Sequence, residues 1–260
     1  MRTIAPAVAA VLEQLELDQP LLVNREDLDE ARQATASSTT TKYLIDELTA
    51  EGWLLPLRTR GYWEFAPAAR AGAIDAGDPQ VELRATLLKR PDLPVALAAE
   101  SAAWLHSLSA RSPNRHVIAA PSDLRLPPAL SDYRVVRYEA KLDPDLSSDL
   151  PLWRVPTLLV AMSHRPASYR DWPNVTEWLS QAASRAKEAD LRIELADEPR
   201  STWMRLAYLL DRGGQEDLAH RLAADAPAGR GPYYLGSRDR SGRHAGHYDV
   251  IDSVLIEQAP

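Results

Sequence analysis

The side chains near the N-terminus that could take part in recognition are hydroxyls and cations in two short stretches. Residues 38–43 read Ser-Thr-Thr-Thr-Lys-Tyr at the start of a predicted helix, and Arg58 and Arg60 flank a predicted turn. Hydroxyl groups hydrogen-bond to phosphates or base edges, and Lys and Arg neutralise phosphates. The pattern predicts recognition of DNA; the alternative is a capped surface helix in a scaffold that binds none. The predicted DNA contacts are Ser38, Thr39, Thr40, Lys42, Tyr43, Arg58 and Arg60.

A second cationic stretch lies near the C-terminus, in a loop rich in Gly and Arg over residues 229–243. Guanidinium groups in such a loop suit an acidic partner or a nucleic-acid backbone. The alternative, to which we give equal weight, is a solvated hairpin loop that binds no partner. The predicted partner-binding residues are Arg230, Arg238, Arg240 and Arg243.

The carboxylates of the same region do not form a convincing catalytic pair. Gly236-Ser237 followed by Asp249 and Asp252 is faintly similar to nucleotidyltransferases, in which two carboxylates hold catalytic metal ions. Residues three apart on one strand point to opposite faces of the sheet, so this pair is badly placed. Ser101 and His106 lack a Gly-x-Ser-x-Gly elbow. We therefore predict no catalytic residues and no enzymatic activity.

Metal and cofactor sites are equally poorly supported. The chain has no cysteine, which excludes disulfides, zinc ribbons and thiol catalysis. His244 and His247 are three residues apart in a loop with no matching ligand pair, a pattern typical of exposed histidines. The sequence predicts no metal and no cofactor.

Composition indicates a globular protein of 260 residues with 45% hydrophobic and 26% charged residues. No apolar run is long enough for a membrane span and no signal layout opens the chain, so we expect a cytoplasmic location. The net charge of −7 excludes coating of nucleic acid by overall positive charge. Residues 1–70 hold seven basic and eleven acidic side chains, so we expect weak DNA binding by one copy, strengthened by pairing on repeated sites.

Three helices and a hairpin must position the first stretch. An apolar stripe predicts a helix over residues 3–16, and Asn24 is a good N-cap for a second helix to about Arg32. Ser37 or Ser38 can cap a third helix that ends at Gly52 and buries a face of Thr41, Leu44, Ile45 and Leu48. Strands over residues 53–58 and 62–66 then form a hairpin. This succession is the layout of a winged helix-turn-helix, whose third helix enters the major groove.

The rest of the chain predicts a second, larger domain of mixed α and β structure. Small, aperiodic residues indicate a linker, followed by a helix that opens at Asp78-Pro79. Strands are predicted at 95–97, 115–119, 134–139, 152–155, 233–235 and 248–256, and helices at 99–105, 174–187, 201–212 and 215–224. The predicted fold class is α+β, with a winged helix-turn-helix domain over 1–70, a linker over 71–78 and an interaction domain over 79–260.

Four fragments, in their order and spacing, carry a resemblance to a known family. They are Leu44-x-x-x-Leu48-x-x-x-Gly52-Trp53, Gly61-Tyr62-Trp63-Glu64-Phe65-Ala66-Pro67, residues 95–105 with Ser101-Ala102-Ala103, and Arg205-Leu206-Ala207-Tyr208-Leu209-Leu210. The chain resembles the AbiEi antitoxins of type IV toxin-antitoxin systems, which also repress transcription of their own operons.

The resemblance implies a winged helix that binds inverted repeats in a promoter, and a C-terminal domain that counteracts a nucleotidyltransferase-like toxin. Two other functions stay open. One is a one-component regulator whose C-terminal domain binds a small effector, and the other is an enzyme with a helix-turn-helix appendage.

Overall fold

The structure, a computed structural model, describes residues 8–68, 77–147, 149–238 and 241–255. The chain forms two compact units: Met1–Leu93 with Arg125–Asp132, and Pro94–Leu124 with Tyr133–Pro260. Both units contain helices and β-structure, which confirms the predicted α+β class. Most of the predicted linker at 71–78 lies outside the described residues, and the predicted domain division remains a prediction.

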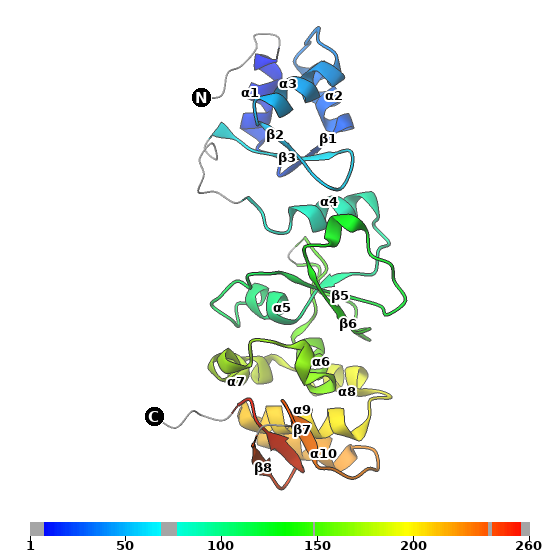
Figure 1. The fold of residues 1–260 in the computed structure, drawn as a ribbon, viewed down its shortest axis with the longest axis vertical. Helices are drawn as coiled ribbons and strands as arrows, with labels where there is room; N and C mark the ends of the chain where they lie inside the picture. The colour runs from blue at the N-terminus through cyan, green and yellow to red at the C-terminus, as the bar shows by residue number, and fades with distance from the viewer. Residues whose placement is uncertain (1–7, 69–76, 148, 239–240, 256–260) are drawn as a thin grey trace. The chain divides into compact units, whose positions relative to one another are not determined.

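The first unit begins with three helices and a small antiparallel sheet. Along the chain the elements run α1 (Ala9–Asp18), β1 (Leu22–Asn24), α2 (Arg25–Ala34), α3 (Thr41–Ala50), β2 (Leu54–Pro56) and β3 (Tyr62–Phe65). The strand order is β1-β3-β2, with Val23 opposite Trp63 and Leu55 opposite Glu64. Figure 1 shows the three helices gathered on one side of this sheet.

The predicted apolar faces form the core of these elements. Val11, Leu12 and Leu15 of α1 pack with Leu44 and Leu48 of α3, and all five are buried. Burial of such side chains stabilises a fold by about 1.5–3 kcal/mol each before entropic costs. The predicted start of the first helix at residue 3 lies outside the described residues.

The helix ends follow the capping chemistry with one correction. Asn24 caps α2 as predicted: its Oδ1 accepts hydrogen bonds from the backbone N–H groups of Glu26 and Asp27. The predicted cap of the third helix at Ser37 or Ser38 is wrong, because Thr40 accepts from the backbone N–H of Tyr43 and α3 starts at Thr41. Gly52 follows this helix with a φ of 75°, a conformation that glycine adopts without strain.

The hairpin loop is joined to the helix that follows it in sequence, α4 (Val81–Lys89). Thr59 is buried in the loop, and its Oγ1 lies 3.1 Å from a Glu82 carboxylate oxygen and 3.0 Å from the hydroxyl of Thr86. This helix starts later than its predicted opening at Asp78, with Gln80 as N-cap. A 3-10 turn, η2 (Pro128–Leu130), also packs against α4 and belongs to the first unit.

The second unit has two further sheets with helices between them (Figure 1). In chain order the elements are β4 (Ala96–Leu97), α5 (Ala99–Leu105), β5 (Val117–Ala120), β6 (Arg134–Arg137), α6 (Val155–His164), α7 (Val175–Arg185), α8 (Glu188–Leu195), α9 (Arg200–Arg212), α10 (Glu216–Asp225), β7 (Tyr233–Leu235), β8 (Arg243–Ala245) and β9 (Val250–Asp252). The sheet β4-β5-β6 contains one antiparallel and one parallel pair, as does the sheet β7-β9-β8. Helix α9 contacts α6, α7 and α10 as well as both β7 and β9, so it is the central helix of the C-terminal part of this unit.

Two predictions for this unit are wrong. The strand expected at 152–155 is reduced to isolated bridges at Leu152, and Val155 already begins α6. No element was predicted between residues 187 and 201, yet α8 (Glu188–Leu195) lies there. Among the described residues, no helix is both long and apolar enough to cross a lipid bilayer.

Candidate functional site

Helix α3 and the segment before it have one set of side chains buried in the core and another set exposed to solvent. Thr41, Leu44 and Leu48 face the core, as the sequence predicts. Ser38, Thr40, Lys42 and Tyr43 are exposed, and Tyr43 keeps 44% of its surface accessible. Thr39 is only half-buried, and its hydroxyl lies 2.9 Å from that of Ser37.

Two threonines at this end of α3 already have structural partners. The Thr40 oxygen caps the helix by accepting from the N–H of Tyr43 at 3.2 Å, which leaves the hydroxyl hydrogen to donate outward. The Thr41 hydroxyl donates to Asp29 Oδ1 at 2.6 Å and so joins α3 to α2. This bond, followed by the bond from Arg32, holds the pKa of Asp29 below its usual value. Sequence reasoning missed Asp29, because a contact across 12 residues leaves no local pattern.

Arg58, at the first side of the hairpin loop, forms an ion pair within the first unit. Its Nη1 lies 2.8 Å from Asp132 Oδ2 and 2.9 Å from the Ser131 hydroxyl, and the Asp132 carboxylate raises the pKa of Arg58. The Arg58 and Asp132 side chains keep 54% and 72% of their surface exposed. Solvent screens such an exposed ion pair, so Arg58 can exchange Asp132 for a phosphate at little cost.

Arg60, at the other side of the turn, is exposed. Its backbone carbonyl accepts a hydrogen bond from Lys89 Nζ at 2.7 Å, which brings a third cation to the hairpin loop. Lys89 was not predicted as a site residue. Its position in the last turn of α4 gives no sequence signal for this contact.

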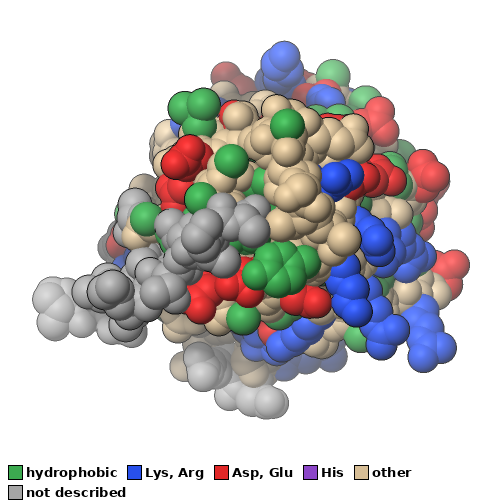
Figure 2. Space-filling view, turned by 90° about the horizontal axis from the view of Figure 1, so that it is seen from above, with side chains coloured by type: hydrophobic (Ala, Val, Ile, Leu, Met, Phe, Trp, Pro, Cys, Tyr) green, Lys and Arg blue, Asp and Glu red, His purple; other side chains and the backbone are tan. Residues whose placement is uncertain are grey.

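Helices α1, α2 and α3 contain few cations, namely Arg25, Arg32 and Lys42. Figure 2 looks at the molecule from the end where α1, α2 and α3 lie in Figure 1; tan atoms fill much of the centre, acidic side chains lie on both sides of them, and a run of basic side chains lies to the right. Attraction of a phosphate backbone to this unit must therefore come from a few cations.

The second predicted cationic stretch is only partly described. Arg230, Arg238 and Arg243 are exposed, whereas Arg240 lies outside the described residues. The Arg238 guanidinium lies over the ring of Tyr234, 5.3 Å from its centroid. The loop therefore exposes arginines, one of them held by a cation–π contact.

The carboxylates near the C-terminus have structural roles in the described part of the chain. Asp252 is buried and accepts hydrogen bonds from the Tyr208 hydroxyl at 2.8 Å and from the N–H groups of Val254 and Leu255. Asp249 pairs with His244 at 3.0 Å. The described residues contain no group of three or more His, Asp or Glu side chains that could hold a metal ion.

Comparisons with known proteins bear on both halves of the chain. Residues 95–212 match the family described as the AbiEi antitoxin C-terminal domain, which confirms the resemblance predicted from the sequence. The crystal structure of the RV2827C protein from Mycobacterium tuberculosis has the same fold, with a TM-score of 0.84 and 29% sequence identity. That match covers 98% of this chain and 94% of the other. The comparison with curated proteins gave no match.

Proposed function

We propose, on the premise that residues 95–212 are an AbiEi-like antitoxin domain, that this protein is a DNA-binding autorepressor and the antitoxin of a type IV toxin-antitoxin pair. The first unit would act as a winged helix-turn-helix that occupies promoter repeats. The second would counteract a nucleotidyltransferase-like toxin. In this proposal the protein works in the cytoplasm, by binding and without catalysis.

The observation that carries the DNA-binding half is the division of α3 into two faces. Thr41, Leu44 and Leu48 fix the helix on the core, while Lys42 and Tyr43 stay exposed beside Ser38 and Thr40. A recognition helix reads bases with residues near its N-terminus, which is where these side chains lie. The helix N-terminus itself favours phosphate.

The hairpin loop supports the same proposal. Arg58, Arg60 and Lys89 supply three cations that can reach a DNA backbone, although the first is paired with Asp132 in the free protein. With so few cations and an acidic chain, one copy should bind weakly at physiological salt. Two copies on an inverted repeat would gain affinity through their effective concentration, so paired sites are expected.

The antitoxin half rests on the family match and on the exposed arginines near the C-terminus. Arg230, Arg238 and Arg243 are candidates for contact with an acidic partner, because guanidinium groups bind carboxylates through two parallel hydrogen bonds. These residues belong to the second unit but follow the matched range. Substituting these arginines therefore tests whether the antitoxin activity also depends on residues after 212.

A reporter driven by the region upstream of the gene tests the repressor function in cells. We expect the full chain to reduce expression and Lys42→Ala to restore most of it, whereas Lys187→Ala, an exposed lysine of the second unit, should repress normally. Equal protein levels are checked by immunoblot. Repression that survives Lys42→Ala would mean that another surface binds the operator.

Co-expression with a nucleotidyltransferase-like protein encoded next to this gene tests the antitoxin function separately. We expect growth to be rescued by the full chain and also by Lys42→Ala, since rescue should not depend on the DNA-binding face. The triple variant Arg230→Ala/Arg238→Ala/Arg243→Ala should rescue growth less well than the wild-type chain. Absence of rescue by the wild-type chain would refute the antitoxin half and leave the repressor half standing.

A further inference from the structure

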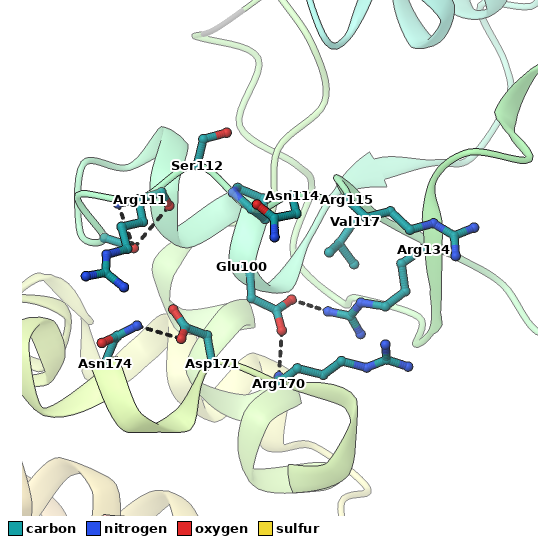
Figure 3. Close-up of a pocket in the computed structure, with 12 residues that line it drawn as sticks. Glu100, Arg111, Ser112, Asn114, Arg115, Val117, Arg134, Arg170, Asp171 and Asn174 are labelled. Atoms are coloured by element: carbon teal, nitrogen blue, oxygen red, sulfur yellow. Dashed lines mark hydrogen bonds and ion pairs between the residues drawn. The ribbon is translucent and has the colours of Figure 1, made fainter.

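The second unit contains a pocket that the proposed function does not use. It has a volume of about 500 Å³ and is partly open to solvent. Its walls come from α5, from the segment before β5, from β6 and from the residues around the 3-10 turn η4 (Trp172–Asn174). Figure 3 shows Glu100 in the centre, Arg111 to one side, and Arg115, Arg134 and Arg170 to the other.

The lining carries more positive than negative charge, and its carboxylates are already engaged. Four arginines face two acidic side chains, Glu100 and Asp171. Glu100 accepts a hydrogen bond from Arg134 Nη2 and another from the backbone N–H of Arg170 at 2.5 Å. Asp171 Oδ1 accepts from Asn174 Nδ2 at 2.7 Å. Within the described residues, neither acid forms an ion pair with Arg111 or with the guanidinium group of Arg170.

One arginine is fixed and two are available. Arg134 is held by Glu100 and donates from Nη1 to the Ser168 carbonyl at 2.6 Å, so it forms a rigid wall. Burial lowers the pKa of this guanidinium while Glu100 opposes the change. The side chains of Arg111 and Arg170 are exposed and make no ion pair with any described residue. Their guanidinium groups can turn toward a ligand without breaking a bond in the fold.

We propose that this pocket binds a small polyanion that carries phosphate or carboxylate groups, with Arg111 and Arg170 as the contacting cations. Guanidinium groups match both oxyanions through paired, charge-assisted hydrogen bonds. The volume lies in the range of small-molecule sites and accommodates a nucleotide or a tricarboxylate. The lining is polar and charged, and Ser112 and Asn114 add uncharged hydrogen-bonding groups, so an apolar ligand would be poorly accommodated.

This proposal does not depend on DNA binding, because all the lining residues belong to the second unit. If the protein is a one-component regulator, this proposal identifies its effector as a small polyanion. Ligand binding is therefore measured directly and without DNA, so that failure of the pocket proposal is distinct from failure of the repressor proposal.

Isothermal titration calorimetry on the full chain tests the site with three probes: pyrophosphate, adenosine triphosphate and citrate. We expect at least one to bind with a Kd below 1 mM, and to bind at least tenfold more weakly to Arg111→Ala/Arg170→Ala. The control is Arg212→Ala, which removes an exposed arginine at the end of α9 and should bind like wild type. Unchanged far-ultraviolet circular dichroism and melting temperature confirm that both variants fold.

The probes also separate the two sources of negative charge. Binding of the phosphorylated probes alone assigns the site to phosphate, and binding of citrate alone assigns it to carboxylate. Absence of binding by all three at 5 mM overturns the proposal. So does binding that the double variant leaves unchanged, because the anion would then lie elsewhere.

Discussion

Thr41 and Lys42 are adjacent in the chain but have opposite surroundings. The Thr41 hydroxyl is buried against Asp29, whereas the Lys42 ammonium is exposed. The first residue therefore sets the position of α3 relative to α2, and the second is left for a ligand. The proposed recognition of DNA depends on both, since a cation contacts phosphate only if its helix is held in place.

Replacing Thr41 with Val should destabilise the protein in a pH-dependent way. The Thr41 bond is the largest cause of the lowered pKa of Asp29, so the stabilisation is present above the ordinary value of 3.8 and is lost as pH falls through the lower folded-state pKa. The urea midpoint of Thr41→Val should fall below that of wild type at pH 6, and the gap should narrow below about pH 3.8. Urea unfolding followed at several pH values measures this.

The control for this experiment is Thr49→Val on the same helix. The Thr49 hydroxyl is buried and has no hydrogen-bond partner among the described residues, so its loss should leave no pH-dependent difference from wild type. If the two variants show the same dependence on pH, the bond between Thr41 and Asp29 does not stabilise the fold.

Helix α3 shows how far a helix can be predicted from its sequence and where prediction stops. Its buried face was predicted correctly, because the spacing of Thr41, Leu44 and Leu48 has the helical period. Its cap was misplaced, because four successive hydroxyl residues from Ser37 to Thr40 are all good caps by type. Only the packing of α3 on the core selects Thr40 among them.

Two variants separate the capping and recognition roles of Thr40. Thr40→Ala should lower the free energy of unfolding by about 1 kcal/mol, the usual cost of losing a cap, whereas Thr40→Ser should keep most of it. Urea denaturation measures both. If Thr40 also reads a base, Thr40→Ser should bind the operator better than Thr40→Ala at a temperature where both are fully folded. Equal operator affinity would limit Thr40 to the capping role.

Helices α6 and α8 were missed for different physical reasons. Nine residues of α6, Val155 to Ser163, are all buried, so this helix has no polar face and no period to detect. Helix α8 carries a carboxylate, Glu194, that is fully buried. This carboxylate accepts hydrogen bonds from Leu142 and Thr157, which lie more than 30 residues away in the sequence. A local sequence pattern cannot reveal such contacts.

Removing the Glu194 carboxylate should be strongly destabilising. Glu194→Ala should lower the free energy of unfolding by about 3 kcal/mol, because four donors, one of them fully buried, lose their acceptor at once. The control is Ile193→Ala, whose side chain is 47% exposed and should cost less than 1 kcal/mol by the usual range for surface positions. A similar loss for both variants in urea denaturation would contradict this role. The donors are the hydroxyls of Thr157 and Tyr138 and the backbone N–H groups of Lys141 and Leu142.

At the scale of the whole molecule, the core of the N-terminal helices and hairpin is self-contained. In the part of the chain that the structure describes, its buried members run from Val8 to Phe65 and include no residue of α4 or of the second unit. The interior of the second unit and the pocket around Glu100 depend on contacts between distant segments, such as Glu100 with Arg134 and Arg170, and could not be predicted from the sequence.

A fragment of residues 1–76 should therefore fold by itself. We expect a single cooperative urea transition by circular dichroism, with a lower midpoint than the full chain because the contacts of Thr59 with Glu82 and Thr86 are lost. The full-length Thr59→Ala variant, which lacks the same side-chain contacts, is the comparison. A fragment with no cooperative transition would show that α4 is part of the folding unit.

The most direct test of the central claim is fluorescence anisotropy of the full chain with the duplex upstream of its own gene and with a scrambled duplex, at two salt concentrations. We predict tighter binding to the upstream duplex. The Lys42→Ala variant should bind this duplex more weakly, and the slope of its log affinity against log salt concentration should be smaller by the amount expected for about one lost phosphate contact. The Lys187→Ala variant, which changes an exposed lysine of the second unit, should bind like wild type. Equal affinity for both duplexes, or no binding at micromolar protein, would contradict the claim that α3 recognises an operator.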